Sequence, residues 1–379
     1  MTLARDVHER YGATFREVDG RAIVRDYGRP ERTHHAVRRV VGVMEAAYGI
    51  VAVTGADKVD FVDNAVTNEV PAEDGRGCYA LLLDPQGRIR VDLYVYNAGD
   101  QLLVFTPPGE AEAIADEWAG RTFVQDVDVR DATREFGVFG IHGPKATEKI
   151  ASVLNNAQSP DEPLSFVRGS MRDDGVTVIR TDNPAGEESY EVICAADAAA
   201  SLFDTLVNYG LNATPFGWTA WNTLTLEAGT PLFETELRNV VPNVAGIRNA
   251  LDFEKGCYVG QEVVSRVENQ GRPSKRIVGL RLESDTNGKE GDAGETLLPE
   301  PGAAVFAGDA SVGEVTRAAV CPTIEGPAAL ARVEYALDDA DADPDLTVRI
   351  DGAEVPAHRT DLPMVDGSAA SARLPTYPD

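Results

Sequence analysis

Two stretches of the chain share one pattern, a short hydrophobic run followed by hydrophobic residues at helical spacing. Residues 48–56 and 136–144 are rich in β-branched and aromatic residues, and each ends in Gly followed by Ala or Pro. Apolar residues three or four positions apart follow, over 59–66 and 146–154. Each stretch is therefore predicted as a strand and then a helix. Strand–Gly–helix is a common unit, but its recurrence predicts two α+β halves of similar build.

Alternation of polar and apolar residues predicts two β-hairpins. In the first, residues 88–96 alternate strictly, Asn97-Ala98-Gly99-Asp100 supplies the turn, and 101–105 return. One face of its first strand then carries Arg90, Asp92, Tyr94 and Tyr96. The second hairpin is predicted over 175–181 and 189–194, followed by a helix over 195–209. Residues 75–80 partly resemble a dinucleotide-binding fingerprint, but they follow a Pro- and acid-containing stretch rather than a strand, which favours a turn.

The two ends of the chain differ in pattern. The first forty residues are polar and are predicted as helical, with a loop near 28–30. Beyond residue 277, short strands at 278–282, 304–306, 313–316, 328–333 and 346–350 predict a small barrel. The Gly- and acid-rich segment 284–296 between two of them is predicted as a solvated loop. These patterns divide the 379 residues into three regions, 1–130, 131–275 and 276–379, a number consistent with the chain length.

Composition narrows the cellular setting. The chain has 62 acidic and 35 basic residues, a net charge of −27, and nearly all of its basic residues are Arg. An acidic surface poor in Lys is typical of proteins from halophiles, where salt screens the repulsion between like charges. Broad nucleic-acid binding is disfavoured because it needs a basic surface. No run of 18 apolar residues and no apolar signal sequence is found, so we expect a cytoplasmic protein without a membrane segment.

The cysteines and histidines do not predict a metal site. The four cysteines are isolated, without a C-x-x-C pair, and the five histidines are scattered. Neither a phosphate-binding Gly-rich motif nor a G-x-S-x-G motif is present. Metal-dependent and serine-hydrolase chemistry are therefore not indicated.

The densest group of chemically active residues is a loop at 254–262. It combines a thiol, an amine, an amide and a carboxylate within eight residues that include two glycines. Its members are Lys255, Gly256, Cys257, Tyr258, Gly260, Gln261 and Glu262, which we call the signature loop. Under the simpler interpretation the loop is a helix entry, with Lys255 and Glu262 solvated and Cys257 a small buried residue.

The motif K-G-C-Y-x-G-Q-E in this loop resembles the signature of YgfZ-type proteins. These are folate-binding relatives of the glycine cleavage T-protein (aminomethyltransferase), and they are associated with the maintenance of iron–sulfur enzymes. Residues 224–233 are similar to the L-x-x-E-A-G-x-P-x-[YF] stretch of both branches. Weaker similarities to family elements occur in the family's order, at 53–57, 67–70, 79–87 and 142–146. The resemblance covers the chain from about residue 48 to its end.

This resemblance implies a fold and a cofactor. The fold would be the three-domain α+β fold of T-proteins, with two ferredoxin-like α+β domains around a folate pocket and a small C-terminal β-barrel. The cofactor would be tetrahydrofolate. Partners would be iron–sulfur enzymes for a YgfZ-type protein, or the lipoyl-bearing carrier protein for a T-protein.

The resemblance also assigns residues. Asp92 matches the T-protein Asp that lies by the reactive folate nitrogens, and a carboxylate there could steer protonation of a folate amine. Its neighbour Arg90 is expected to favour the ionised form of Asp92. Glu187 matches the T-protein Glu that binds the pterin ring, and Tyr94 and Arg180 are predicted to bind folate with it. Without the resemblance, Asp92 would be an exposed strand residue and Glu187 an exposed hairpin tip.

Three functions remain open on the sequence alone. The first is a YgfZ-type maintenance protein, in which Cys257, flanked by Lys255, acts as a thiolate. A thiol at this position and the loss of an Arg at Thr225 favour that branch. The second is a folate-dependent aminomethyl- or methyltransferase in which Asp92 is catalytic. The third is a non-catalytic folate sensor. Among enzymes, a one-carbon transferase is expected.

Overall fold

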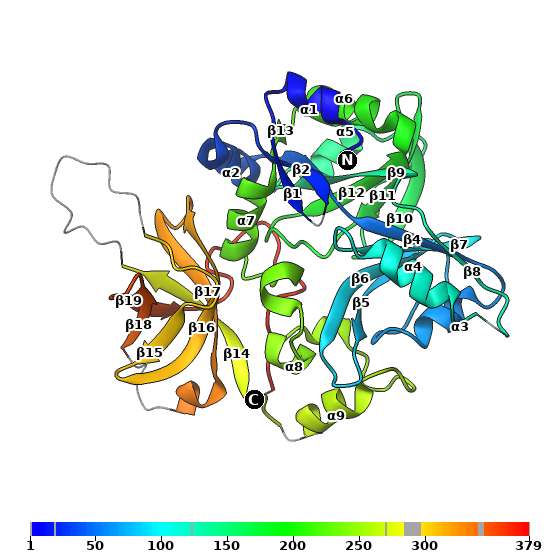
Figure 1. Ribbon diagram of the computed structural model, residues 1–379. Coiled ribbons are helices and arrows are strands. Elements are labelled where there is room, and N and C mark those ends of the chain that lie inside the picture. Colours follow the sequence, from blue (N-terminus) through cyan, green and yellow to red (C-terminus); the bar gives the residue numbers. More distant parts are fainter. Residues whose placement is uncertain are drawn as a thin grey trace.

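A computed structural model describes residues 2–18, 20–122, 124–269, 271–283, 297–339 and 345–378. Two sheets and a barrel form three lobes that meet at the centre of the molecule (Figure 1). The predicted loop at 284–296 lies outside the described residues.

The first sheet has the strand order β5-β6-β7-β4-β8. It consists of β4 (Gly49–Thr54), β5 (Arg76–Leu83), β6 (Ile89–Asn97), β7 (Gln101–Thr106) and β8 (Asp128–Asp131). The helices α3 (Lys58–Asp63) and α4 (Ala111–Ala119) pack against it through Phe61 and Trp118. The predicted hairpin is confirmed as β6 and β7. The turn predicted at 75–80 is wrong, because β5 begins at Arg76 and pairs along β6.

The second sheet has the order β10-β11-β12-β9-β3-β13. Its strands are β3 (Gly42–Glu45), β9 (Phe136–His142), β10 (Phe166–Met171), β11 (Asp174–Arg180), β12 (Ser189–Ala195) and β13 (Thr214–Pro215). The helices α1 (Arg5–Arg10), α5 (Ala146–Val153) and α6 (Ala199–Asn208) bury apolar residues on one of its faces. The second predicted hairpin, the helix after it and the strand–helix repeat are confirmed. The limits 1–130 and 131–275 stay a prediction, although β3 pairs with β9 across them.

The N-terminal segment differs from its prediction. Between α1 and α2 (Pro30–Arg39) lies an antiparallel hairpin, β1 (Thr14–Val18) and β2 (Arg21–Asp26), where helix was expected. The reason is its apolar residues: Ile23 and Val24 are buried, and Val18, Ile23 and Val24 line a cavity described below. The tertiary contact overrides the polar composition of the segment.

The segment between the second sheet and the barrel crosses the centre of the molecule. It contains α7 (Trp218–Glu227), η2 (Phe233–Leu237), α8 (Pro242–Ala245), η3 (Arg248–Ala250) and α9 (Gln261–Asn269). Helix α7 contacts both α2 and strand β16 (Ala310–Cys321) of the barrel, so it joins two lobes (Figure 1).

The predicted C-terminal barrel is confirmed as a closed barrel of order β14-β17-β16-β15-β18-β19. The strands are β14 (Lys275–Leu282), β15 (Ala304–Ala307), β16 (Ala310–Cys321), β17 (Gly326–Glu334), β18 (Leu346–Ile350) and β19 (Ala353–Thr360), with η4 (Tyr335–Asp339) after β17. Strand β19 was not predicted, because its residues, of which one is buried, show little hydrophobic alternation.

The C-terminal tail (residues 361–378) leaves the barrel and returns to the centre of the molecule, drawn in red in Figure 1. Backbone hydrogen bonds fix it along the way, from Met364 N–H to Glu227 O at 2.8 Å and from Ala372 N–H to Asp182 O at 2.9 Å. The tail therefore reaches the hairpin loop between β11 and β12.

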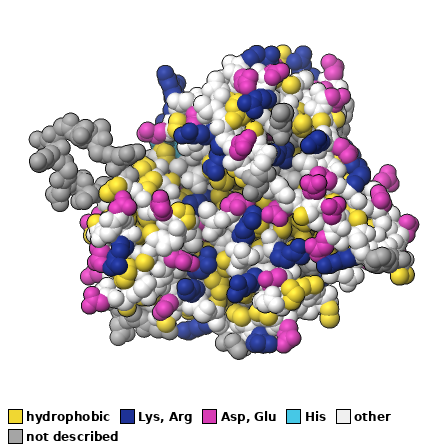
Figure 2. Space-filling view, viewed as in Figure 1, with side chains coloured by type: hydrophobic (Ala, Val, Ile, Leu, Met, Phe, Trp, Pro, Cys, Tyr) yellow, Lys and Arg dark blue, Asp and Glu magenta, His cyan; other side chains and the backbone are white. Residues whose placement is uncertain are grey.

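Two surface properties bear on the setting. Acidic and basic side chains are interspersed over the face seen in Figure 2. None of the helices in the described ranges is long and apolar enough to cross a membrane.

Candidate functional site

A cavity of about 170 Å³ lies where the two sheets face each other. The first sheet contributes Asp92, Tyr94 and Phe105, and the second contributes Gly140, His142 and Glu191. Helix α7 adds Trp218 and Trp221, and the C-terminal tail adds Arg373. Segments that are far apart in the sequence thus meet at one mostly apolar cavity that contains several aromatic rings and buried charges.

Strand geometry explains why these side chains face inward. Alternate residues of a strand point to opposite faces, so Asp92 and Tyr94 leave β6 on the side of the second sheet. On β12, Glu191 is directly opposite Gly140 of β9. Gly140 carries no side chain, and a Cβ placed there would lie 2.5 Å from His142 Nε2. The glycine thus makes room for the imidazole of His142.

Asp92 is buried, with 7 % of its surface exposed, so the interpretation as an exposed strand residue is wrong. Its Oδ2 accepts a hydrogen bond of 2.9 Å from Tyr79 Oη and lies 3.7 Å from Arg373 Nη1. Arg90 is not its partner, which corrects the sequence prediction: its guanidinium forms an ion pair with Glu117 at the surface. Burial raises the pKa of Asp92, and the Arg373 guanidinium and the Tyr79 hydrogen bond oppose that rise.

Tyr94 lines the cavity beside Asp92 and connects it to the hairpin loop of the second sheet. Its hydroxyl donates to both oxygens of Asp182, at 2.9 Å each. Arg373 Nε lies 3.2 Å from Asp182 Oδ2, and its guanidinium lies over the rings of Tyr79 and Tyr94, at 5.3 and 5.8 Å. Two carboxylates, two phenols and one guanidinium therefore form a single buried network.

Glu191 is a further buried carboxyl in the cavity. Tyr48 Oη donates a hydrogen bond of 2.7 Å to Glu191 Oε1. Burial raises the pKa of Glu191 to about 7, with the negative charge of Asp182 adding to the rise. Sequence reasoning did not assign this residue, although a carboxylate at an alternating position of a hydrophobic strand is a signal that could have found it.

His142 is another titratable group of the cavity that the sequence did not assign to a site. It is 2 % exposed, and its ring lies 5.0 Å from that of Trp221. Burial lowers the pKa of His142 to about 3. Its Nδ1 has no hydrogen-bond partner within the described residues. The imidazole is therefore neutral over the range in which most enzymes work.

Glu187 and Arg180 lie apart from the residues that line the cavity in the described structure. Glu187 is buried, so the exposed hairpin tip is wrong, and its oxygens accept hydrogen bonds from Arg38 Nη1 at 3.0 Å and from Ser368 N–H at 2.9 Å. The Arg180 guanidinium lies 4.8 Å from the ring centre of Tyr190. Their folate-binding roles stay a prediction.

The signature loop is also separate from the described residues that line the cavity. Lys255 is buried, which contradicts the solvated interpretation, and its Nζ donates to Asp63 Oδ1 at 2.7 Å and to Asn68 O at 2.6 Å. Gln261 Nε2 donates to Lys255 O at 3.1 Å, and Tyr258 is buried. Cys257 is exposed, so its interpretation as a buried residue is wrong too.

The remaining members of the loop have local roles. Gly260 has φ of +82°, and a Cβ there would lie 2.7 Å from Asp84 O, so the turn requires glycine. Glu262 forms an exposed i,i+4 ion pair with Arg266 on α9. Gly256 has open space around it.

Comparison with known families decides the relationship of the chain. Residues 4–255 match the family described as the GCVT N-terminal domain. Residues 275–366 match the glycine cleavage T-protein C-terminal barrel domain.

The chain belongs to the glycine cleavage T-protein family.

Several members of the family are similar to the chain over nearly its whole length. A protein of Cutibacterium acnes named aminomethyltransferase is 31% identical, over 94% of this chain and 96% of its own. A Bacillus subtilis protein of the same name is 27% identical, over 91% and 93%. The crystal structure of glycine cleavage system aminomethyltransferase T from Bartonella henselae has a TM-score of 0.82 at 21% identity, covering 97% of this chain and 98% of that one. The predicted T-protein fold is thereby confirmed.

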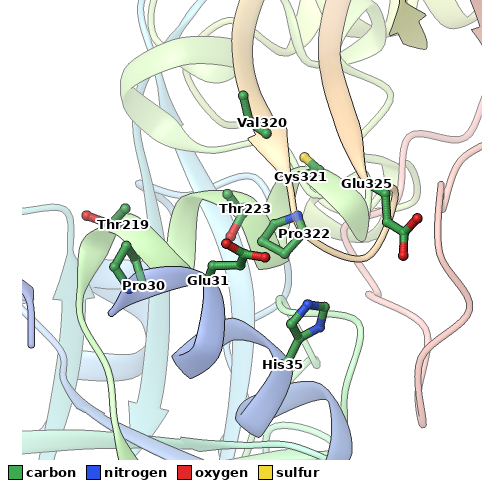
Figure 3. Close-up of a pocket in the computed structure, with 9 residues that line it drawn as sticks. All are labelled: Pro30, Glu31, His35, Thr219, Thr223, Val320, Cys321, Pro322 and Glu325. Atoms are coloured by element: carbon green, nitrogen blue, oxygen red, sulfur yellow. The ribbon is translucent and has the colours of Figure 1, made fainter. Parts of the chain in front are cut away.

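The T-protein fold of this chain contains a second, larger hollow of about 540 Å³ (Figure 3). It lies between helices α2 and α7 and the β16–β17 hairpin of the barrel, and Glu31, His35, Cys321 and Glu325 are its titratable lining residues. The buried carboxylates and aromatic walls of the smaller cavity distinguish it as the candidate site, since ligand sites are mostly apolar with a few placed polar groups.

Proposed function

We propose that the protein is a tetrahydrofolate-dependent aminomethyltransferase of the T-protein type. The observation that carries the proposal is the buried Asp92 carboxylate, held by Tyr79 and Arg373 in an aromatic cavity between the two sheets. Relatives named aminomethyltransferase support it. This was the second of the three functions considered from the sequence, and it now has better support than the first.

The residues of the cavity fit a reduced folate. Phe105, Tyr94 and Trp221 offer aromatic faces to a flat pterin ring. Asp92 and Glu191 offer acceptors for its N–H groups, and His142 Nδ1, which has no partner among the described residues, is a further polar group beside them. Because about 170 Å³ is less than the roughly 300–1,000 Å³ of a typical ligand pocket, the cavity would take the ring end of the folate rather than the whole molecule.

Tetrahydrofolate, when bound, would supply the amine nitrogens that accept the one-carbon unit. Asp92 would hold or receive a proton beside them, since a carboxylate in a buried site is a stronger base than one in water. Tyr79 would fix the carboxylate orientation through its hydrogen bond. The two sheets would exclude water, so the main contribution of the protein would be positioning.

The donor in this proposal is an aminomethyl group carried by a lipoyl-bearing carrier protein. The acidic, Lys-poor composition supports a high-salt setting, so binding and transfer should be measured in concentrated KCl.

The test is formation of methylene-tetrahydrofolate by the purified protein from an aminomethyl-loaded carrier. We expect Asp92→Asn to lower the rate by about 10²–10⁴-fold, the usual contribution of one acid–base group, while tetrahydrofolate still binds. Asp100→Asn, in the exposed turn of the same hairpin, is the matched control and should leave the rate unchanged. Equal rates for Asp92→Asn and wild type would overturn the proposal.

A YgfZ-type function is the second candidate, because the signature loop presents Cys257 to solvent. In that case Cys257→Ala would abolish support of iron–sulfur enzyme activity in cells, and Asp92→Asn would not. A non-catalytic folate sensor would bind tetrahydrofolate and respond to neither substitution except in affinity.

A further inference from the structure

The C-terminal tail delivers a buried guanidinium to the centre of the molecule. Arg373 is 7 % exposed and lines the cavity, although its neighbours in sequence follow the last strand of the barrel. The tail is fixed on both sides of it: Ala372 N–H donates to Asp182 O at 2.9 Å, and Thr376 N–H donates to Gly246 O at 2.9 Å. The position of Arg373 is therefore set by backbone hydrogen bonds as well as by its own contacts.

Acidic side chains outnumber basic ones in the cavity around Arg373. Among the described residues that line the cavity it is the one Lys or Arg, whereas Asp92, Glu191, Glu45 and Glu234 are acidic. Glu45 Oε2 lies 2.7 Å from His8 Nε2 on α1. The groups that face Asp92 from the packed elements are Tyr79 on β5, Tyr94 on β6, Asp182 in the β11–β12 loop, and Arg373 on the tail.

Arg373 is arranged to act on Asp92 through charge. Its Nε is 3.2 Å from Asp182, while its Nη1 is 3.7 Å from Asp92, beyond hydrogen-bond distance. Asp182 and the faces of Tyr79 and Tyr94 fix the guanidinium, and its charge then acts on the Asp92 carboxylate across a short gap. In a buried site such an opposite charge strongly favours the ionised form of a carboxyl group.

We propose that Arg373 is a positioning residue of the site, which keeps Asp92 ionised and ready to take a proton. The inference rests on the proposed transferase function for its role in the reaction, but the charge coupling itself concerns only the protein. It makes the C-terminal tail part of the site.

The test compares Arg373→Met and Arg373→Lys with wild type in the full-length protein. The titration midpoint of Asp92 is followed by NMR of carbon-13-labelled Asp carboxyls, with the Asp92 signal assigned by its loss in Asp92→Asn. We expect Arg373→Met to raise the midpoint by at least about one pH unit, because an opposite charge within ~4–6 Å shifts a carboxyl by about 1–3 units. Arg373→Lys keeps the charge and should restore most of the midpoint.

The rate of transfer is measured on the same variants across pH. For Arg373→Met we expect a loss of rate at pH 7 that matches the loss of ionised Asp92 given by its measured midpoint, and a smaller loss at higher pH, where Asp92 becomes ionised. The matched control is Arg317→Met, because Arg317 is also buried but donates to Thr225 Oγ1 at 2.8 Å and Thr230 O at 2.9 Å. It should lower stability and leave the Asp92 midpoint in place.

The outcomes are distinct. An unchanged Asp92 midpoint in a folded Arg373→Met protein overturns the inference. If wild type catalyses no transfer but the midpoint still moves, the proposed function fails and the charge coupling stands. If Arg373→Met does not fold, the Arg373→Lys variant is decisive. An Asp92 midpoint and a pH profile that both match wild type support a role for the charge. A raised Asp92 midpoint with no change in the rate of transfer overturns a role in the reaction.

Discussion

The hydroxyl of Tyr48 donates a 2.7 Å hydrogen bond to Glu191 and so links the two sheets at the cavity. Tyr48 immediately precedes β4 of the first sheet, and Glu191 lies on β12 of the second. The bond connects two lobes at the point where the candidate ligand would lie. The bond also gives the buried Glu191 carboxyl one hydrogen-bond donor, while burial disfavours the charged form of that carboxyl.

The pH dependence of stability should reveal the titration of the Glu191 carboxyl. Burial raises the pKa of Glu191 to about 7, above its usual value of 4.5. The folded state therefore binds this proton more tightly than the unfolded state. The contribution of the proton to the free energy of unfolding is complete below pH 4.5 and is lost as the pH rises through 7. Glu191→Gln cannot ionise and should become more stable than wild type above pH 7, by up to about 3 kcal/mol at pH 9, when measured by urea unfolding at several pH values.

The control for this experiment is Glu112→Gln on the exposed side of α4, which should show the same pH dependence as wild type. If Glu191→Gln and wild type differ by a constant amount at every pH, Glu191 does not titrate in this range and the argument from burial is wrong.

Gly140 should be intolerant of a side chain because of His142. A Cβ at position 140 would lie 2.5 Å from the His142 Nε2 atom, closer than packed atoms approach. Gly140→Ala should therefore push the imidazole away and cost about 1–3 kcal/mol of unfolding free energy, as overpacking does, and it should weaken tetrahydrofolate binding. The double variant Gly140→Ala/His142→Ala measures the coupling: additive costs would mean that the two residues do not clash.

The features that could be predicted from the sequence are local ones. Alternation is a property of a few neighbouring residues, so the β6–β7 hairpin was found, and the family resemblance then pointed to Asp92 on its inward face. The two α+β halves and the barrel followed from the same patterns together with the resemblance. The hairpin β1–β2 was missed because its few apolar residues line the cavity and do not form a regular amphipathic pattern along the sequence.

The features that were missed depend on contacts between distant segments. Arg373 lies on the tail, and nothing in its neighbourhood of small residues and prolines indicates that the tail returns to Asp92. Arg90 was preferred as the partner because it is two residues away on the same strand face, yet it lies near the strand end and reaches Glu117 instead. Sequence proximity identified a plausible pair, and tertiary packing produced a different one.

Cysteine reactivity should separate one thiol from the other three. Cys78, Cys194 and Cys321 are buried, and burial raises the pKa of each to about 12, whereas Cys257 is exposed. Because the thiolate is the reactive form, a disulfide reagent should titrate one thiol in the native protein and four after unfolding. Cys257→Ser should leave none reactive in the native state. A second fast thiol in that variant would mean that a buried cysteine becomes exposed by local opening.

Lys255 should be important for the structure of the signature loop rather than for the reactivity of its cysteine. Its ammonium group is bonded to Asp63 and to the Asn68 carbonyl, so its charge is committed to the end of α3 and the segment after it. Lys255→Met removes these bonds and leaves Asp63 without its cation, which should cost about 2–4 kcal/mol of unfolding free energy. Lys145→Met, which removes an exposed ion pair with Glu148, should leave the free energy of unfolding nearly unchanged, because solvent screens exposed ion pairs. In the folded Lys255→Met variant, the rate at which Cys257 reacts with the disulfide reagent should stay within about twofold of wild type. A tenfold slower reaction would show that the ammonium group activates the thiol, and it would favour the YgfZ-type function.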